Sequence, residues 1–120
     1  MNIVELADTI KKHPDYDKAG MILYHNGIVR GTSRDGRKVS GLEITVDWEK
    51  LRQIVGEQKK RPGIIEILVE IAEGELSVGD DVMLLVVAGD FRENVITTLR
   101  DTLNAIKTTV TQKTEFFIGE

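Results

Sequence analysis

Apolar residues recur at helical spacing in three segments of the chain. In the first segment they occupy positions i, i+3, i+4 and i+7 of an amphipathic helix, namely Ile3, Leu6, Ala7 and Ile10. The pair His13-Pro14 ends this helix, because proline disfavours helical geometry in the residue before it. In the second segment Asp47 can cap a helix that Pro62-Gly63 brings to an end. The apolar side of this helix is formed by Trp48, Leu51, Ile54 and Val55.

The third segment is the longest. Asp90 and Glu93 form a D-x-x-E capping pattern at its start. The residues expected to face the core are Val95, Ile96, Leu99, Leu103 and Ile106. We therefore predict a third and longer helix that begins near residue 90.

Five further segments have the composition of strands. The first begins at Gly20 and reads GMILYHNGIV, and Gly27 within it marks a bulge or a close backbone approach. In the second, every other residue from Leu42 to Val46 is apolar, which predicts one buried and one solvated face. The next two read GIIEILVEIA and DVMLLVVAG and flank the expected turn EGELSVGD. The DVMLLVVAG strand is apolar enough to be covered on both faces, and the last strand reads TVTQKTEFFI.

The order of these elements, α-β-β-α-β-β-α-β, predicts an α+β fold with helices packed on a mixed β-sheet. The sequence has 120 residues, of which 41% are apolar. This is enough for one buried core and too little for two domains of ordinary size. We therefore expect residues 1–120 to form a single domain.

Composition excludes several kinds of chemistry. Cysteine is absent, so the chain supplies no disulfide, thiolate metal ligand or thiol nucleophile. The two histidines lie twelve residues apart, which argues against a zinc site. A net charge of −4 argues against general nucleic-acid binding, and no apolar run approaches the length of a membrane helix. The N-terminus has no secretory pattern, so we expect a cytoplasmic protein without a metal or a bound cofactor.

A basic loop stands out against this acidic background. Between Arg30 and Lys38 the chain has four cationic side chains and one acid, Asp35. Guanidinium groups bind phosphate or carboxylate in bidentate fashion, and Gly31 and Gly36 would let the backbone approach a ligand. A solvated hairpin loop has the same composition, since Lys and Arg discourage pairing at sheet edges. Charge alone favours the solvated loop.

Three other cations have ordinary alternatives. Arg92 lies in the first turn of the long helix, where the helix dipole favours an anion, but it is also positioned to pair with Asp90 or Glu93. Lys107 and Lys113 lie at the end of that helix and in the final strand. A lysine with a lowered pKa can act as an acid, a base or an amine nucleophile. Compensation of the helix dipole is the ordinary explanation for Lys107.

Four short patterns follow one another along the chain. The first is a glycine, an apolar strand and G-x-V-R, from Gly20 to Arg30. The second is G-E-L-x-x-G-D, from Gly74 to Asp80. The third is a strand followed by Arg92 and a long helix that ends in lysine, and the fourth is a K-x-E strand at 113–115. Over about residues 19 to 116, these patterns together resemble the large, catalytic subunit of molybdopterin synthase.

This resemblance implies an α/β-hammerhead-like fold and a homodimer that carries two small ubiquitin-like subunits in a heterotetramer. The Gly-Gly C-terminus of the small subunit would bring sulfur as a thiocarboxylate. The enzyme would add two sulfurs to cyclic pyranopterin monophosphate and so form molybdopterin. A cysteine-free chain suits this sulfur transfer because the partner supplies the sulfur. The phosphorylated pterin substrate would also give the basic loop a purpose.

The resemblance assigns site residues one by one. Lys107 corresponds to a lysine near the C-terminal glycine of the partner, and Lys113 to a lysine implicated in catalysis. Arg30 and Arg92 correspond to arginines that line the anionic pocket. Glu115 corresponds to the acid of the K-x-E pattern.

The loop beyond Arg30 varies in the family. For Arg34, Arg37 and Lys38 the resemblance therefore implies an electrostatic contribution at most.

Three departures from the family bear on activity. Phe91 stands where the family has a histidine that could hold substrate or shuttle a proton. The segment from Lys107 to Lys113 is one residue shorter than usual and lacks the family's proline. The sequence ends at Glu120, without the family's tail that lends an arginine to the neighbouring subunit.

Three interpretations follow: an active sulfurtransferase, a non-catalytic dimeric relative that binds a pterin or a ubiquitin-like tail, and a structural dimer with a solvated loop. If both lysines share one pocket with Arg30 and Arg92, the first is favoured.

Overall fold

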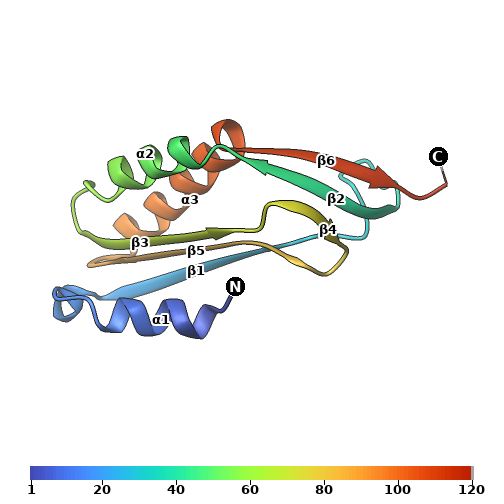
Figure 1. Ribbon diagram of the computed structural model, residues 1–120. Helices are drawn as coiled ribbons and strands as arrows, with labels where there is room; N and C mark the ends of the chain where they lie inside the picture. The colour runs from blue at the N-terminus through green and yellow to red at the C-terminus, as the bar shows by residue number, and fades with distance from the viewer. Residues whose placement is uncertain (120) are drawn as a thin grey trace.

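The structure is a computed structural model that describes residues 1–119 (Figure 1). Glu120, and with it the expected shortened end, lies outside the described residues. The helices are α1 (Ile3–Lys11), the 3-10 helix η1 (Tyr16–Lys18), α2 (Trp48–Gln58) and α3 (Arg92–Thr109). The strands are β1 (Met21–Ile28), β2 (Val39–Val46), β3 (Ile64–Ile71), β4 (Gly74–Ser77), β5 (Asp81–Gly89) and β6 (Thr111–Phe117). All eight predicted elements are present, and η1 and β4 are additional.

The strands form two three-stranded sheets, one with the order β1-β5-β3 and one with the order β4-β2-β6. Helices and sheets occur as the α+β prediction requires. Where we expected a mixed sheet, however, every pairing between the described strands is antiparallel. A parallel pair needs a crossover between two strands of one sheet. Here α2 connects β2 to β3 and α3 connects β5 to β6, and in both cases the two strands lie in different sheets.

The prediction that EGELSVGD is only a turn is wrong. Gly74–Ser77 forms the strand β4, which pairs with β2 so that Leu76 lies opposite Leu42. The turn itself is confined to the residues that follow, where Gly79 has a φ of 92° and the Asp80 N–H donates to the Ser77 carbonyl at 3.0 Å. Four residues are too few for the alternation of a strand to show in the sequence.

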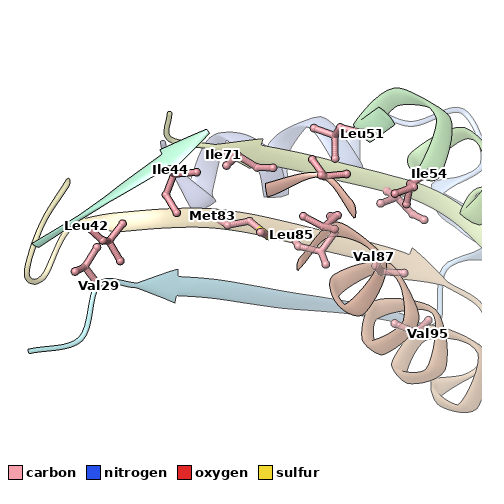
Figure 2. Close-up of a cluster of buried hydrophobic side chains, with 13 residues drawn as sticks. Val29, Leu42, Ile44, Leu51, Ile54, Ile71, Met83, Leu85, Val87 and Val95 are labelled. Atoms are coloured by element: carbon pink, nitrogen blue, oxygen red, sulfur yellow. The ribbon is translucent and has the colours of Figure 1, made fainter. Parts of the chain in front are cut away.

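The sheet β1-β5-β3 is covered on both faces, by α1 on one side and by α2 and α3 on the other (Figure 1). The central strand β5 is accordingly buried on both faces, as predicted. Towards α1 it contributes to a small cluster of Leu6, Ile10, Leu84, Val86 and Ala88. Towards α2 and α3 it contributes Met83, Leu85 and Val87 to a larger cluster that includes Leu51, Ile54 and Val95 (Figure 2).

Local hydrogen bonds begin two of the helices. The Asn2 side chain accepts from the Val4 N–H at 2.9 Å, and the Asp47 carboxylate accepts from the Lys50 N–H at 3.0 Å, which confirms Asp47 as a cap. The capping pattern predicted for α3 is wrong. The N-cap is Phe91, which makes no side-chain cap bond.

Asp90 precedes α3 and organises the approach to it. Its Oδ1 accepts from the Phe91 N–H at 2.6 Å and from Asn94 Nδ2 at 2.8 Å. The hydrogen bond from Asn94, followed by that from the Phe91 N–H, lowers the pKa of the Asp90 carboxyl below its ordinary value.

Two apolar residues expected in the core are exposed. Trp48 is 41% exposed, and its Nε1 donates to Glu73 Oε1 at 3.3 Å. Ile96 is 49% exposed, because the side of α3 that faces the sheet is formed by Val95, Thr98, Thr102 and Ile106. Two threonines in this stripe weaken the apolar pattern, and this explains why the sequence places Ile96 on the wrong face.

The molecule is elongated, with principal extents of 52 × 25 × 23 Å, because the sheet β4-β2-β6 extends beyond the helices (Figure 1). Leu42 and Ile44 of β2 pack with Val29 and Met83 and join the second sheet to the core (Figure 2). At this junction β1 has the predicted bulge, a register shift between Gly27 and Ile28. Among residues 1–119, no helix combines the length and hydropathy needed to cross a membrane.

Candidate functional site

A cleft of about 790 Å³ lies where the two sheets, the basic loop and the end of α3 meet. We call its apolar lining residues the floor and its polar and charged lining residues the walls. The floor residues are Ile28, Leu42, Ile44, Val82 and Met83. The wall residues are His25, Arg30, Thr32, Ser33, Arg34, Lys107, Thr111, Lys113 and Glu115, and Gly27 also lines the cleft.

Lys107 and Lys113 reach the cleft from different elements. Lys107 lies in the last turn of α3, and Lys113 is the third residue of β6, opposite Ile44 on β2. Residues two apart on a strand point to the same face, so Thr111, Lys113 and Glu115 all line the cleft. The short segment between the two lysines therefore leaves both side chains on the same cleft.

Arg30 and Arg34 come from the loop after β1. Val29 is buried and fixes the start of this loop, and Arg30 Nε donates to the Thr32 carbonyl at 3.1 Å. A β-bridge between Thr32 and Lys38 closes the base of the loop. Arg30 and Arg34 therefore belong to a loop with a defined conformation, and this loop forms one wall of the cleft.

Arg37 is in the same loop but does not line the cleft. Its guanidinium carbon lies 3.7 Å from the centre of the Phe117 ring, and its Nε lies 3.0 Å from Asp35 Oδ2. Ser33 donates a short hydrogen bond to Asp35, and this bond, followed by the Arg37 N–H, lowers the pKa of the Asp35 carboxyl. Arg37 thus holds the loop against β6.

Arg92 is not brought to the cleft within one chain. It is the first residue of α3, and an α-helix rises about 1.5 Å per residue, so about 22 Å of helix separates it from Lys107. Its side chain is 79% exposed, and its Nε lies 3.2 Å from Glu93 Oε1. This ion pair is the ordinary alternative that the sequence suggested.

The charge of the cleft is unbalanced. Four cationic side chains line it, Arg30, Arg34, Lys107 and Lys113, against the single carboxylate of Glu115. Within residues 1–119, none of the four makes an ion pair with an acid. An anionic ligand would balance this charge, and a phosphate offers oxygens to both guanidinium and ammonium donors. The part of the chain that the structure describes contains no cluster of three or more His, Asp or Glu suited to a metal.

The family model described as MoaE protein matches residues 2–109. The chain belongs to the MoaE family. Its members are large subunits of molybdopterin synthase, and membership places this chain in molybdenum cofactor biosynthesis. The matched range ends before β6, so Lys113 and Glu115 lie outside it. The search of curated proteins found no match.

Solved structures confirm the fold class. Molybdopterin synthase from Staphylococcus aureus is 25% identical, with a TM-score of 0.74 over 87% of this chain and 79% of that one. A MoaE protein from Burkholderia multivorans is 20% identical, with a TM-score of 0.77 over 96% and 80% of the two chains. A complex of subunits 1 and 2 of the molybdopterin-converting factor from Helicobacter pylori contains a chain 17% identical, with a TM-score of 0.71 over 100% and 86%.

Phe91 distinguishes this MoaE protein from the pattern expected of the family. Phe91 is 68% exposed and directly precedes α3, at the opposite end of that helix from Lys107. Phe91 therefore neither closes the cleft of its own chain nor packs beneath it.

His25 is a wall residue that the sequence reasoning missed. It lies on β1 opposite Leu85, on the face that also carries Leu23 and Gly27. Burial, with a further contribution from the positive charge of Lys107, lowers the pKa of the His25 imidazole below its ordinary 6.5. A histidine at a core-facing position of a predicted strand was the available signal, because strand alternation places residues 23, 25 and 27 on one face.

Proposed function

We propose that this MoaE protein transfers sulfur from the C-terminal thiocarboxylate of a small ubiquitin-like subunit to cyclic pyranopterin monophosphate, forming molybdopterin. One observation carries the proposal. In a MoaE fold, Lys107 and Lys113 line one cleft together with two arginines, and among the described residues 1–119 no acid forms an ion pair with any of these four cations. Such a cleft suits a phosphorylated substrate.

Each lysine has a separate task in this proposal. Lys113 acts as the acid and base for proton transfers to the pterin, from its place on the cleft-facing side of β6. Lys107 contacts the carbonyl of the partner's tail and stabilises the charge that develops when the thiocarboxylate reacts. Both are exposed enough to meet ligands that arrive from solvent.

The remaining site residues bind and orient the substrate. Arg30 clamps the phosphate, Arg34 adds to the attractive potential, and Glu115, on the same face of β6 as Lys113, accepts hydrogen bonds from the substrate. Arg92 lies too far along α3 to help within its own chain, so its role as an anion clamp requires a dimer in which it reaches the neighbour's cleft.

The partner is a small subunit with a Gly-Gly C-terminus. The structural likeness to a chain of the Helicobacter pylori complex of subunits 1 and 2 supports a two-subunit assembly for this protein. A flexible tail is the part of a small protein best suited to enter a cleft of about 790 Å³.

A single-turnover assay tests the proposal. Purified protein is mixed with thiocarboxylated small subunit and cyclic pyranopterin monophosphate, and dithiolene product is measured for the wild type, Lys113→Ala and Lys60→Ala. Lys60 is an exposed lysine after α2, outside the cleft, and serves as the matched control. We expect product from the wild type and from Lys60→Ala and none from Lys113→Ala. Binding of the small subunit without product in the wild type would instead support the non-catalytic relative.

A further inference from the structure

His25 occupies a distinctive place in the cleft. Its side chain projects from β1 on the face that packs towards α3, and the same face of the neighbouring strand β5 carries Met83 and Leu85, which do not titrate. Gly27, two residues on, borders the imidazole, since a Cβ at that position would lie 3.4 Å from His25 Nε2, at van der Waals contact. The ring is thus held by apolar neighbours and is open towards the polar wall.

Charged groups approach His25 from three directions. Lys107 comes from α3, Lys113 and Glu115 come from β6, and Arg30 and Arg34 come from the basic loop. On the other face of β1, Asn26 Nδ2 donates to Asp81 Oδ1 at 3.1 Å, so this acid is engaged away from the cleft. Within residues 1–119, no hydrogen bond or ion pair engages the His25 ring nitrogens.

His25 differs from these charged groups in its hydrogen bonding and in its ability to change charge. Ammonium and guanidinium groups only donate hydrogen bonds, and an ionised carboxylate only accepts them. An imidazole both accepts and donates, and its charge changes between pH 5 and 8. Of the side chains that line the cleft, His25 alone can change its charge in response to a ligand near neutral pH.

We propose that His25 is an anion-linked proton acceptor: the imidazole is neutral in the free protein, and it takes up one proton from solvent when a phosphate-like anion binds among Arg30, Arg34 and Lys107. The resulting imidazolium donates a hydrogen bond to the bound anion. This inference rests on the proposed function for the identity of the ligand, and it adds a proton-coupled step to binding.

The charge of a bound anion compensates the positive charge around His25. In the empty cleft partial burial, and with it the positive charge of Lys107, disfavours the imidazolium. A bound dianion offsets much of this positive charge and accepts a hydrogen bond from the imidazolium, so the charged form becomes the favoured one. Linkage is reciprocal, so the anion raises the proton affinity of His25 by the same factor by which the proton raises the affinity for the anion. A shift of one pKa unit corresponds to about a tenfold change in affinity.

Inorganic sulfate is the appropriate probe, because it carries two negative charges and does not itself titrate near neutral pH. Calorimetric titrations with sulfate in two buffers of different ionisation enthalpy measure the protons taken up on binding. We expect uptake of a substantial fraction of one proton near pH 6.5, and sulfate binding that tightens by about tenfold between pH 7.5 and pH 5.5. In His25→Gln both effects disappear.

His13 provides the matched control. It lies outside the cleft, where its Nε2 is 3.9 Å from Glu66 Oε2, and the chain has only these two histidines. In an NMR titration of the imidazole signals, the His25 midpoint should move to higher pH with sulfate while the His13 signal is unaffected. His13→Gln should retain proton uptake.

The outcomes separate this inference from the proposed function. Sulfate binding with no proton uptake and an unmoved His25 midpoint would overturn the inference, and so would a cleft that does not bind sulfate. A protein that takes up the proton but forms no dithiolene in the single-turnover assay would overturn the proposed function alone.

Discussion

Lys107 and Lys113 line the same cleft although one belongs to a helix and the other to a strand, because the junction between them is fixed. Val110 joins α3 to β6 and is 3% exposed. Its N–H donates to the Ile106 carbonyl at 2.9 Å, and its carbonyl accepts from the Asp47 N–H at 2.8 Å. These two hydrogen bonds connect the end of α3, the start of β6 and the start of α2. A junction of this kind keeps the backbone positions of the two lysines in a constant relation, and a mechanism that depends on exact positioning requires this.

Replacing Lys107 tests whether its charge acts in the reaction. Lys107→Gln keeps a polar side chain and removes the charge, and we expect the single-turnover rate to fall about 10²–10³-fold, as when one preorganised electrostatic group is lost. Lys11→Gln, in the last turn of α1 and outside the cleft, is the control and should keep the wild-type rate. Since both lysines are exposed, neither change should alter the free energy of unfolding much. Equal rates for the two variants would remove Lys107 from the mechanism.

The two arginines Arg30 and Arg37 lie in one loop but should have different effects. Arg30→Ala removes a guanidinium from the cleft, and we expect the Kd for sulfate to rise about tenfold, consistent with a charged hydrogen bond of about 1.5 kcal/mol. Arg37→Ala removes the contact with Phe117 and should lower the free energy of unfolding by about 0.5–1 kcal/mol, with little change in that Kd. Calorimetry and urea unfolding measure the two quantities. A larger loss of sulfate affinity in Arg37→Ala would contradict this division.

The sequence predicted the elements better than it predicted their faces. The apolar run of β5 identified both the strand and its burial. A strand that is covered on both faces has no polar residue in its buried part, here 83–89. The division into two sheets was not predictable, since strand pairing depends on contacts distant in sequence.

The same limit applies to the candidate site. Four of the predicted cations line the cleft, namely Lys107, Lys113, Arg30 and Arg34. Arg37 and Arg92 are also cationic, but they lie outside the cleft on the surface of the chain. His25 was missed because a single polar residue in a strand does not reveal which groups lie near it. Its charged neighbour Lys107 is known only once α3 is placed beside β1.

Ile106 and Ile96 offer a matched test of the face of α3 that packs on the sheet. Both are isoleucines in one helix and both were predicted to face the core, but Ile106 is fully buried and Ile96 is half exposed. We expect Ile106→Ala to lower the free energy of unfolding by about 2–5 kcal/mol, through lost burial and the cavity left behind. Ile96→Ala should change it by about 0.5 kcal/mol or less. Urea unfolding of both variants measures the difference, and similar losses would mean that α3 is rotated from the position described here.

The lowered pKa of His25 predicts how stability depends on pH. In the unfolded chain the imidazole takes up a proton as the pH falls through about 6.5, whereas in the folded protein it stays neutral until a lower pH. Between these two values the unfolded state binds more protons, so the free energy of unfolding decreases as the pH falls. His25→Gln has no such term, and the difference between the two unfolding curves isolates it. Saturating sulfate should shrink this difference, because the bound anion raises the folded pKa. A difference that grows in favour of the wild type at low pH would show that the folded pKa lies above 6.5, and the imidazole would then already be charged in the empty cleft.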